Sequence, residues 1–230
     1  SGQGGGIGVL EGSAKIERNT IANNTASPGG SGLGGGLHLS RAHAWLDANT
    51  IEGNLADAGI GGNAGAAVLD RCPVFTLTNN IVARNGCTTM GSGVVIGGGQ
   101  GQLTHNTFVE NTRGDGLAVL VSEGSQTTLT NNIIAGHWQG IGVDDPGTSV
   151  VTASYSLFEG NGVDYGPGVG SSHEVAGPAD LLPDYHLGGA SNAIDNALPL
   201  AAITHDVDGD RRPYRDGPDV GADEASCLAR

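Results

Sequence analysis

The amino-acid sequence predicts an all-β fold, a single-domain solenoid in which short strands stack coil upon coil. A repeat places apolar, Asn, apolar and Asn residues at successive spacings of three, two and three. Its six copies begin at Ile16, Leu46, Leu77, Leu103, Leu129 and Ala153, which are 30, 31, 26, 26 and 24 residues apart. A fixed period in this range is typical of solenoids. No segment has the three-four apolar spacing of a helix, and the abundant Gly and Asn disfavour one.

A Gly-rich segment with alternating apolar residues precedes each copy of the repeat. These segments are residues 4–9, 34–39, 65–69, 93–96, 116–119 and 140–143. Such alternation predicts a strand with one buried face. Each coil is therefore expected to contain two strands, a turn between them, an Asn turn and a loop. Two short strands cannot bury an apolar face alone, so the coils must stack about 4.8 Å apart.

Stacking would turn equivalent positions into ladders. The apolar ladder predicted for the interior comprises Ile21, Ile51, Val82, Phe108, Ile134 and Phe158. The structural Asn ladder comprises Asn24, Asn54, Asn85, Asn111 and Asn161, with His137 in its fifth position. Stacked amides can donate and accept along such a column. Asn also tolerates the left-handed backbone of a sharp turn, so we expect this ladder at a turn.

The regular coils are predicted over residues 1–161, and irregular coils with a cap over 162–230 of the same domain. Residues 164–178 read as a Gly- and Ser-rich loop. The distinctive segments that follow are 178–187, 191–195, 206–213 and 219–224. At its other end, the chain opens at Ser1 directly with a Gly-rich coil entry, as a processed or excised piece would.

Over essentially its whole length the chain resembles the right-handed parallel β-helix of the pectate-lyase-like superfamily. The succession of segments after residue 178 is similar to the C-terminal end of bacterial surface and secreted β-helix repeat proteins of the choice-of-anchor type. Asn192 departs from this resemblance, because the family commonly has Pro there. The resemblance implies right-handed coils, a tail that closes the end of the solenoid, and a secreted or cell-surface location in bacteria.

The charge balance limits the partners. The net charge is −14 with a single lysine, Lys15. An acidic surface without basic stripes argues against nucleic acid and anionic membranes. No apolar run of about 18 residues is present, so membrane insertion is not expected. The predicted partners are further copies of this chain or cell-surface glycans.

Two of the three cysteines, Cys72 and Cys87, lie in one coil, each just past a strand. They could form a disulfide, which would indicate an oxidising compartment. Unpaired thiols are the alternative, and Cys227 is left over in either case.

Members of the pectate-lyase-like superfamily include polysaccharide lyases and hydrolases, whose sites lie on an outward strand face and the adjoining turns. The outward column predicted here is Gly8, His38, Val68, Val95, Ala118 and Gly142. It carries almost no reactive side chains. The adjoining turns bring Glu11 into one charged cluster with the residues a lyase would use, His38, Arg41, Asp70 and Arg71. A ladder of charges that only satisfies neighbouring turns is the alternative.

The tail contains one candidate metal site. Asp206, Asp208 and Asp210 alternate along a tight turn and would suit calcium, which prefers carboxylate oxygens. The alternative is that these residues cap turns and pair with Arg211, Arg212 and Arg215. No other cofactor is predicted.

Three functions remain open from the sequence. The nearly bare outward face favours a noncatalytic extracellular or cell-surface solenoid with a structural or adhesive role. Because no capping helix precedes the first coil, such a solenoid is expected to self-associate end to end, as a filament. The alternatives are a polysaccharide lyase or hydrolase acting on acidic glycans, and a glycan-binding module. The balance leans against an enzyme.

Overall fold

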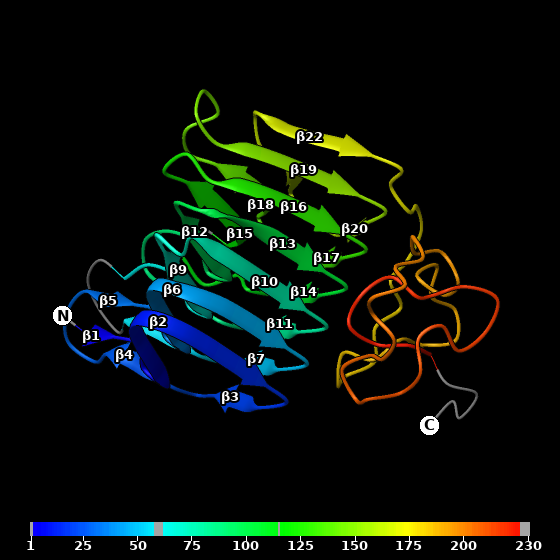
Figure 1. Cartoon of the computed structure of the whole chain (residues 1–230), viewed down its shortest axis with the longest axis horizontal. Coiled ribbons are helices and arrows are strands. Elements are labelled where there is room, and N and C mark those ends of the chain that lie inside the picture. Colours follow the sequence, from blue (N-terminus) through cyan, green and yellow to red (C-terminus); the bar gives the residue numbers. More distant parts are fainter. Residues whose placement is uncertain (1, 58–61, 115, 226–230) are drawn as a thin grey trace.

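The computed structural model of the protein describes residues 2–57, 62–114 and 116–225. In these residues the chain forms 22 β-strands and no helix. The strands wind into a stack of parallel coils, with the N-terminal coils at one end and the later coils at the other (Figure 1). The prediction of an all-β solenoid is confirmed.

Each coil has three faces. The strands β2 (Ile7–Glu17) and β6 (Leu37–Asp47) run through the first two faces, which therefore belong to one sheet. The first face continues with β9 (Ala67–Asp70), β12 (Val94–Gly97), β15 (Leu117–Ser122), β18 (Gln139–Val143) and β21 (Val163–Tyr165). The second face continues with β10 (Val74–Thr78), β13 (Gln100–Thr104), β16 (Gln126–Thr130), β19 (Val150–Ser154) and β22 (Val169–Ser172).

The third face is a sheet of three-residue strands that lie between the two Asn positions of each repeat. They are β3 (Thr20–Ala22), β7 (Thr50–Glu52), β11 (Ile81–Ala83), β14 (Thr107–Val109), β17 (Ile133–Ala135) and β20 (Leu157–Glu159). Two further pairs join β1 (Gly2–Gln3) to β5 (Gly32–Leu33), and β4 (Thr25–Ser27) to β8 (Leu55–Asp57). The prediction of two strands per coil missed this third face.

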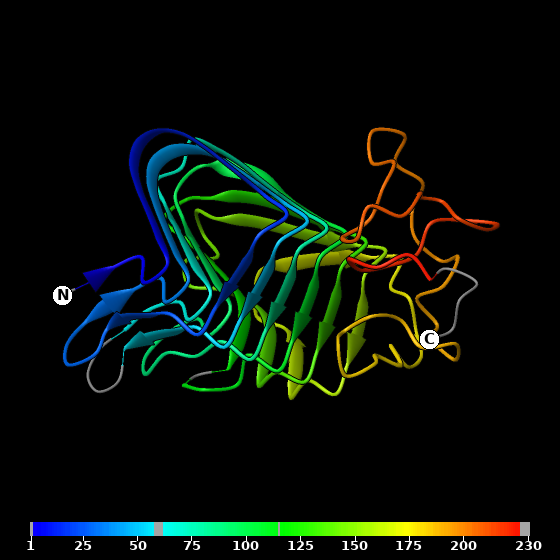
Figure 2. The same ribbon diagram turned by 90° about the horizontal axis from the view of Figure 1, so that it is seen from below.

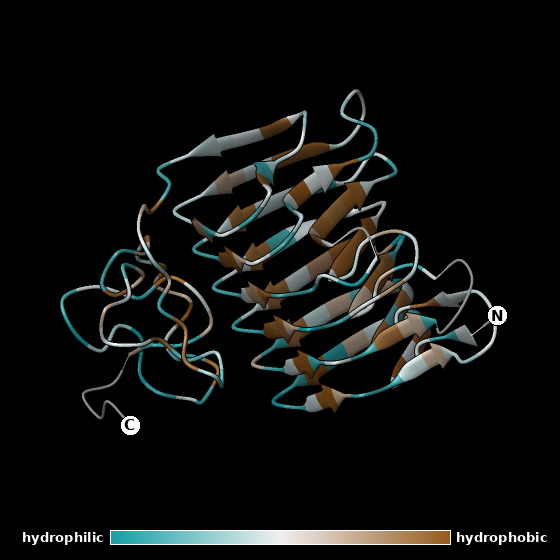
Figure 3. Cartoon of the chain, turned by 180° about the vertical axis from the view of Figure 1, so that it is seen from behind, coloured by the Kyte–Doolittle hydropathy of each residue, from teal (hydrophilic) through white to brown (hydrophobic). Residues whose placement is uncertain are grey.

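The register places like over like, as the repeat predicts. Val82 pairs with Ile51 on one side and with Phe108 on the other. In this apolar ladder Ile51, Val82, Phe108 and Ile134 are fully buried. In Figure 3 the strands carry hydrophobic stretches beside pale or hydrophilic ones, whereas many of the turns between them are hydrophilic. Burial of these aliphatic columns is the main driving force for stacking.

Left-handed residues bend the chain at each corner. At the first corner, between the first and second faces, Glu11, Arg41, Arg71, Gly98 and Glu123 all have φ between 48° and 77°. In the Asn ladder the residue before each Asn has the positive φ, for example Arg84 before Asn85. The ladder therefore lies at a turn, as predicted, but the left-handed backbone belongs to the residue before each Asn.

The strands β21 and β22 form part of a seventh coil, where the sequence predicted only a loop. The tail, defined here as residues 173–225, then folds back beside the stack, as two perpendicular views show (Figures 1 and 2). Its apolar residues pack on the outer side of the third face, where Leu187 and Val220 join a cluster with Ile133 and Leu157. The described tail thus covers a side of the solenoid, and the prediction that it closes the end was wrong.

The third face can accept this cover because its strands are apolar on both surfaces. Ile81, Ala83, Val109 and Ala135 point away from the interior, yet each is at most 8% exposed. Backbone bonds complete the contact, since Ala222 N donates to Thr107 Oγ1 at 2.9 Å and Gly221 N to the carbonyl of Asn131 at 2.9 Å.

Candidate functional site

The Asn ladder is a hydrogen-bonded column through the stack. The backbone N and the Nδ2 of Asn54 both donate to Asn85 Oδ1, at 2.9 and 3.0 Å. Asn85 repeats this towards Asn111, and its Nδ2 also donates to the carbonyl of Ile51 at 2.8 Å. A second ladder lies at the second corner, between the second and third faces. It contains Asn19, Asn49, Asn80, Asn106 and Asn132. These amides hold the coils in register.

His137 occupies the fifth position of the Asn ladder. Its Nε2 lies 3.2 Å from Asn111 N and 3.1 Å from Asn111 Nδ2, so it takes the place of an amide oxygen. Both of these Asn111 groups are hydrogen-bond donors, so Nε2 must accept and cannot carry a proton. Burial lowers the pKa of His137 to about 4, against a raising contribution from its hydrogen bond with Asn161.

The charged residues predicted for a lyase site form two separate ion-paired groups at the first corner. Arg41 Nε lies 3.5 Å from Glu11 Oε1, and Arg71 Nε lies 3.9 Å from Asp70 Oδ1. Glu123 Oε2 also lies 3.5 Å from Arg71 Nε, from two coils away. These arginine side chains are more than half exposed. The charges therefore form an open ladder on the surface.

Glu123 was missed because the predicted column was shifted at β15. Val95 pairs with Leu120, so Leu120 holds the position assigned to Ala118, and Glu123 follows at the corner. Gly98 separates Arg71 from Glu123, because its coil has no side chain at this corner. The contact of Arg71 with Glu123 crosses that gap.

His38 lies in the outward column of the first face and is only 5% exposed. Burial lowers the pKa of His38, while the charge of Asp70 raises it. Asp70 Oδ2 accepts a hydrogen bond from Ser40 Oγ at 2.8 Å. His38 is thus a covered, neutral side chain beside the charged ladder.

The candidate disulfide between Cys72 and Cys87 is not formed. Cys72 is a buried free thiol whose Sγ donates to the carbonyl of Leu39 at 3.4 Å. Cys87 is also buried, with its Sγ 3.9 Å from Ser92 Oγ. Cys227 lies outside the described residues.

Two adjoining cavities form a groove along the third corner, where the chain leaves the third face at the Asn ladder. They measure about 380 and 220 Å³ and share Arg84 and Arg113. We call them the corner groove; its walls are Asn23, Thr25, Gly53, Asn54, Leu55, Arg84, Asn85, Gly86, Glu110, Thr112, Arg113 and Gly136. The groove extends from the first coil to the fifth, a length of about 19 Å at 4.8 Å per coil.

The two arginines of the corner groove differ in their contacts. Arg84 Nε lies 3.2 Å from Glu110 Oε2, its Nη1 lies 3.8 Å from Glu52 Oε1, and its guanidinium stacks over the ring of Tyr185 at 5.3 Å. Tyr185 OH in turn donates to Glu52 Oε1 at 2.7 Å. Arg113, by contrast, has no ion pair with any described residue and is exposed. Sequence reasoning missed this groove because its residues come from the third corner of five different coils.

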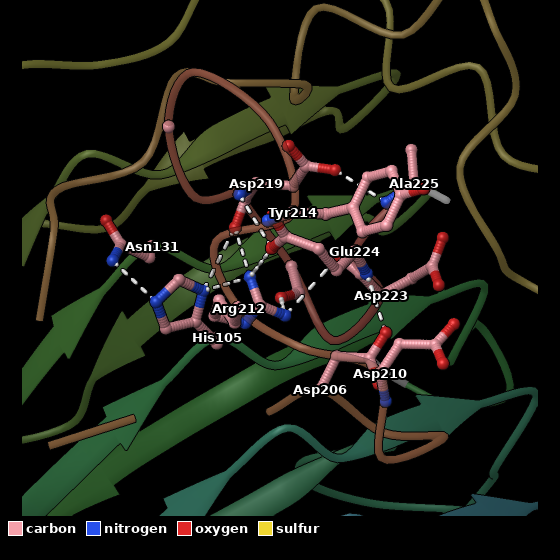
Figure 4. Close-up of polar contacts among 12 residues, drawn as sticks. His105, Asn131, Asp206, Asp210, Arg212, Tyr214, Asp219, Asp223, Glu224 and Ala225 are labelled. Carbon is pink, nitrogen blue, oxygen red and sulfur yellow. Dashed lines mark hydrogen bonds and ion pairs between the residues drawn. The ribbon is translucent and has the colours of Figure 1, made fainter. Parts of the chain in front are cut away.

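A buried charge network joins the loops of the tail (Figure 4). Arg212 Nη1 lies 3.1 Å from Glu224 Oε2, and both side chains are 1% exposed. Arg212 also donates to the carbonyls of Asp219, Gly221, Ala222 and Asp223. Burial raises the pKa of Glu224 to about 7, although Arg212 and two backbone N–H groups oppose this. The network therefore holds the segment around Arg212 against the last described segment of the tail.

His105 connects this network to the solenoid. Asn131 is fixed by two bonds to Leu198, so its Nδ2 donates to His105 Nε2 at 2.9 Å. On the other side of the ring, His105 Nδ1 lies 3.0 Å from the carbonyl oxygen of Asp219 and 2.9 Å from Arg212 Nη1. Burial, together with the charge of Arg212, lowers the pKa of His105 well below its usual value. His105 is a neutral link between the tail and the second corner.

The three aspartates predicted to bind calcium do not converge. Asp206 is fully buried, and its Oδ1 accepts the backbone N–H groups of Asp208, Gly209 and Asp210 at 2.8–3.0 Å. Its Oδ2 accepts Glu224 N at 2.9 Å. Asp206 therefore caps its own turn, as the alternative interpretation held. Asp208 instead lies near His186 and Asp223.

The stacked parallel coils define the class of the protein, which is a parallel β-helix. Residues 1–122 of the 230 match the family described as "Right handed beta helix region", and the chain belongs to that family. Searches of curated proteins and of solved structures each returned no match. Across the described part of the chain, no helix has the length and apolar character needed to cross a membrane.

Proposed function

We propose that the chain is a noncatalytic, extracellular or cell-surface β-solenoid with an adhesive role, and that it binds acidic glycans in the corner groove. The observation that carries this proposal is the position of Arg113. This exposed cation lines both cavities and has no ion pair with a described residue, in a chain of net charge −14. A carboxylate or sulfate on a sugar is a suitable partner for a guanidinium.

The shape and polarity of the groove support an extended ligand. A length of about 19 Å exceeds what a single sugar fills, at 4.8 Å per coil. Its walls combine hydroxyl and amide groups of Thr25, Thr112 and Asn23 with glycines at Gly53 and Gly136. Such walls can hydrogen-bond sugar hydroxyls and let a chain approach the backbone.

The contacts of the charged residues favour binding over catalysis. At the first corner, Arg41 and Arg71 are exposed and pair with carboxylates of their own ladder. In the groove, Arg84 is held by Glu52 and Glu110. A lyase needs a base and a charge-neutralising group that converge on one substrate carbon. The paired arginines fit a fixed surface better than that arrangement.

The experiment compares Arg113→Ala with Lys15→Ala, which removes an exposed cation from the first coil. Binding to pectate, alginate and sulfated glycans is measured by calorimetry, and the ultraviolet absorbance of unsaturated ends reports cleavage. We expect Arg113→Ala to weaken binding at least fivefold and Lys15→Ala to leave it unchanged. Product formation that is lost in Arg71→Ala would establish the lyase alternative and refute this proposal.

Self-association is a second candidate, supported by the edges of the first coil. Among the described residues, β2 pairs only with β6 and β3 only with β7, which leaves one side of each strand unpaired. Leu10 in β2 is 66% exposed. A second copy of the chain can pair with such an edge. Light scattering over a wide concentration range should show assembly; a constant monomer mass would exclude it for this chain.

A further inference from the structure

Three separate segments of the tail meet at one small site. His186 directly follows the turn of residues 182–185, Asp208 lies on the turn capped by Asp206, and Asp223 lies on the last described segment. One ligand atom from each of the three side chains lies within 4.8 Å of the others. His186 Nε2 is 2.7 Å from Asp208 Oδ2. None of these three residues belongs to the Arg212–Glu224 pair.

The carboxylate of Asp223 is buried and has no ion pair with a described residue. Asp223 is only 6% exposed, and among the described residues its side chain accepts one hydrogen bond, from Leu187 N at 2.8 Å. The neighbouring Asp206 and Asp208 add negative charge. A buried carboxylate of this kind gains stability from a bound cation.

His186 is arranged as a metal ligand with an orienting carboxylate. Asp184 Oδ1 lies 3.2 Å from Nδ1, on the side of the ring opposite to Asp208, but without hydrogen-bond geometry, so Nδ1 is buried without a hydrogen-bond partner. A carboxylate that accepts a hydrogen bond from one ring nitrogen fixes the ring and favours the lone pair at the other nitrogen. Asp184 is 68% exposed, so a small movement of its side chain would complete this bond. With carboxylates at both nitrogens, the space at Nε2 suits a positive charge, either a second proton or a metal ion.

We propose that His186, Asp208 and Asp223 bind one Zn²⁺ ion, with Asp184 orienting the imidazole. One nitrogen and two carboxylate oxygens suit zinc, whereas calcium prefers six or more oxygen ligands. Asp208 is 55% exposed, so its side chain can move from the hydrogen bond with His186 to the ion. The ion would connect the three segments and stabilise the tail, since binding to the folded state adds to its stability.

The test measures zinc binding to the chelator-treated 230-residue chain by calorimetry, with circular dichroism to confirm folding. We expect one Zn²⁺ per chain, calcium binding at least tenfold weaker, and a higher melting temperature with zinc. Asp208→Asn should weaken zinc binding at least tenfold and remove the rise in melting temperature. The matched control is Asp210→Asn, which removes an exposed carboxylate on the same turn and should leave both measurements unchanged.

The outcomes separate the proposal from its rivals. Absence of saturable zinc binding, or equal binding by the wild type and Asp208→Asn, would overturn it. Calcium binding as tight as that of zinc and lost in Asp210→Asn would assign the site to the Asp206–Asp210 turn instead. His186→Gln provides an independent second variant, and because Asp208 is exposed, Asp208→Asn decides the question if His186→Gln does not fold.

Discussion

His137 makes the Asn ladder sensitive to pH. Its Nε2 accepts from Asn111 N and Nδ2, and the side chain is 3% exposed. A proton on Nε2 would face two donors and break this part of the ladder. The variant His137→Asn restores an amide oxygen at the same position. Its Nδ2 would be expected to donate to the carbonyl of Phe108, as Asn111 Nδ2 donates to Val82.

The size of the effect follows from the pKa. In the folded chain the pKa of His137 is about 4, below its ordinary value of 6.5. The unfolded chain therefore binds a proton as the pH falls below 6.5, whereas the folded chain does not until about pH 4. The contribution of neutral His137 to the free energy of unfolding is fully present above pH 6.5 and is lost as the pH falls towards 4. At pH 5 the loss is about 2 kcal/mol, from 1.5 pH units at 1.36 kcal/mol each.

Urea denaturation of the wild type and of His137→Asn at pH 5 and pH 7.5 tests this reasoning. The free energy of unfolding of the variant minus that of the wild type should be about 2 kcal/mol larger at pH 5 than at pH 7.5, because only the wild type loses stability at pH 5. His43→Asn, which removes an exposed histidine, serves as the control and should show no such difference. Parallel pH profiles for the wild type and His137→Asn would refute the assignment of an unprotonated Nε2.

Three further predictions concern stability. Asn85→Ala should cost about 2–4 kcal/mol in urea denaturation, because it leaves donors of Asn54 and the carbonyl of Ile51 unpaired. Arg212→Met should release the tail to limited proteolysis and cost about 3–5 kcal/mol, whereas a double variant with Glu224→Met should cost less. In the presence of chelator, Asp223 should contribute stability below about pH 4 that is lost as the pH rises to about 6, up to about 3 kcal/mol. Asp223→Asn should remove this slope in thermal melts, and an unchanged slope would contradict it.

The repeat was enough to predict which residues stack. Asn54 and Asn85 recur at the same position of successive copies, and the structure pairs them directly. Ile51 and Val82 likewise meet in adjacent coils. Spacing predicts these contacts because, in a stack of parallel coils, each residue lies directly over the equivalent residue of the neighbouring coil.

The same logic failed at β15 for a physical reason. Shifting a strand by two residues keeps every side chain on the same side, so apolar alternation cannot distinguish Ala118 from Leu120 as the partner of Val95. The pattern specifies the face to which a side chain points more strongly than its position along the strand. Glu123 was missed for this reason, and with it one of the two carboxylates near Arg71.

The position of the tail depended on a signal that was present but unused. Third-face strands such as Ile133–Ala135 are apolar on both sides, which is the pattern of a sheet covered on both faces. A cover over that face could therefore be predicted. The convergence of His186, Asp208 and Asp223 could not, because it depends on how three irregular segments pack.

The corner groove and the proposed zinc site are connected through two consecutive residues. Tyr185 stacks beneath Arg84 in the groove, and His186 belongs to the metal cluster. A zinc ion that fixes His186 would also restrict Tyr185 and hence Arg84, which lowers the ordering cost of binding a ligand in the groove. Binding linkage is reciprocal, so the glycan should then raise zinc affinity by the same factor as zinc raises glycan affinity. Calorimetric titrations in both orders measure this factor. A factor of one in both would mean that Tyr185 is already fixed by Glu52 alone.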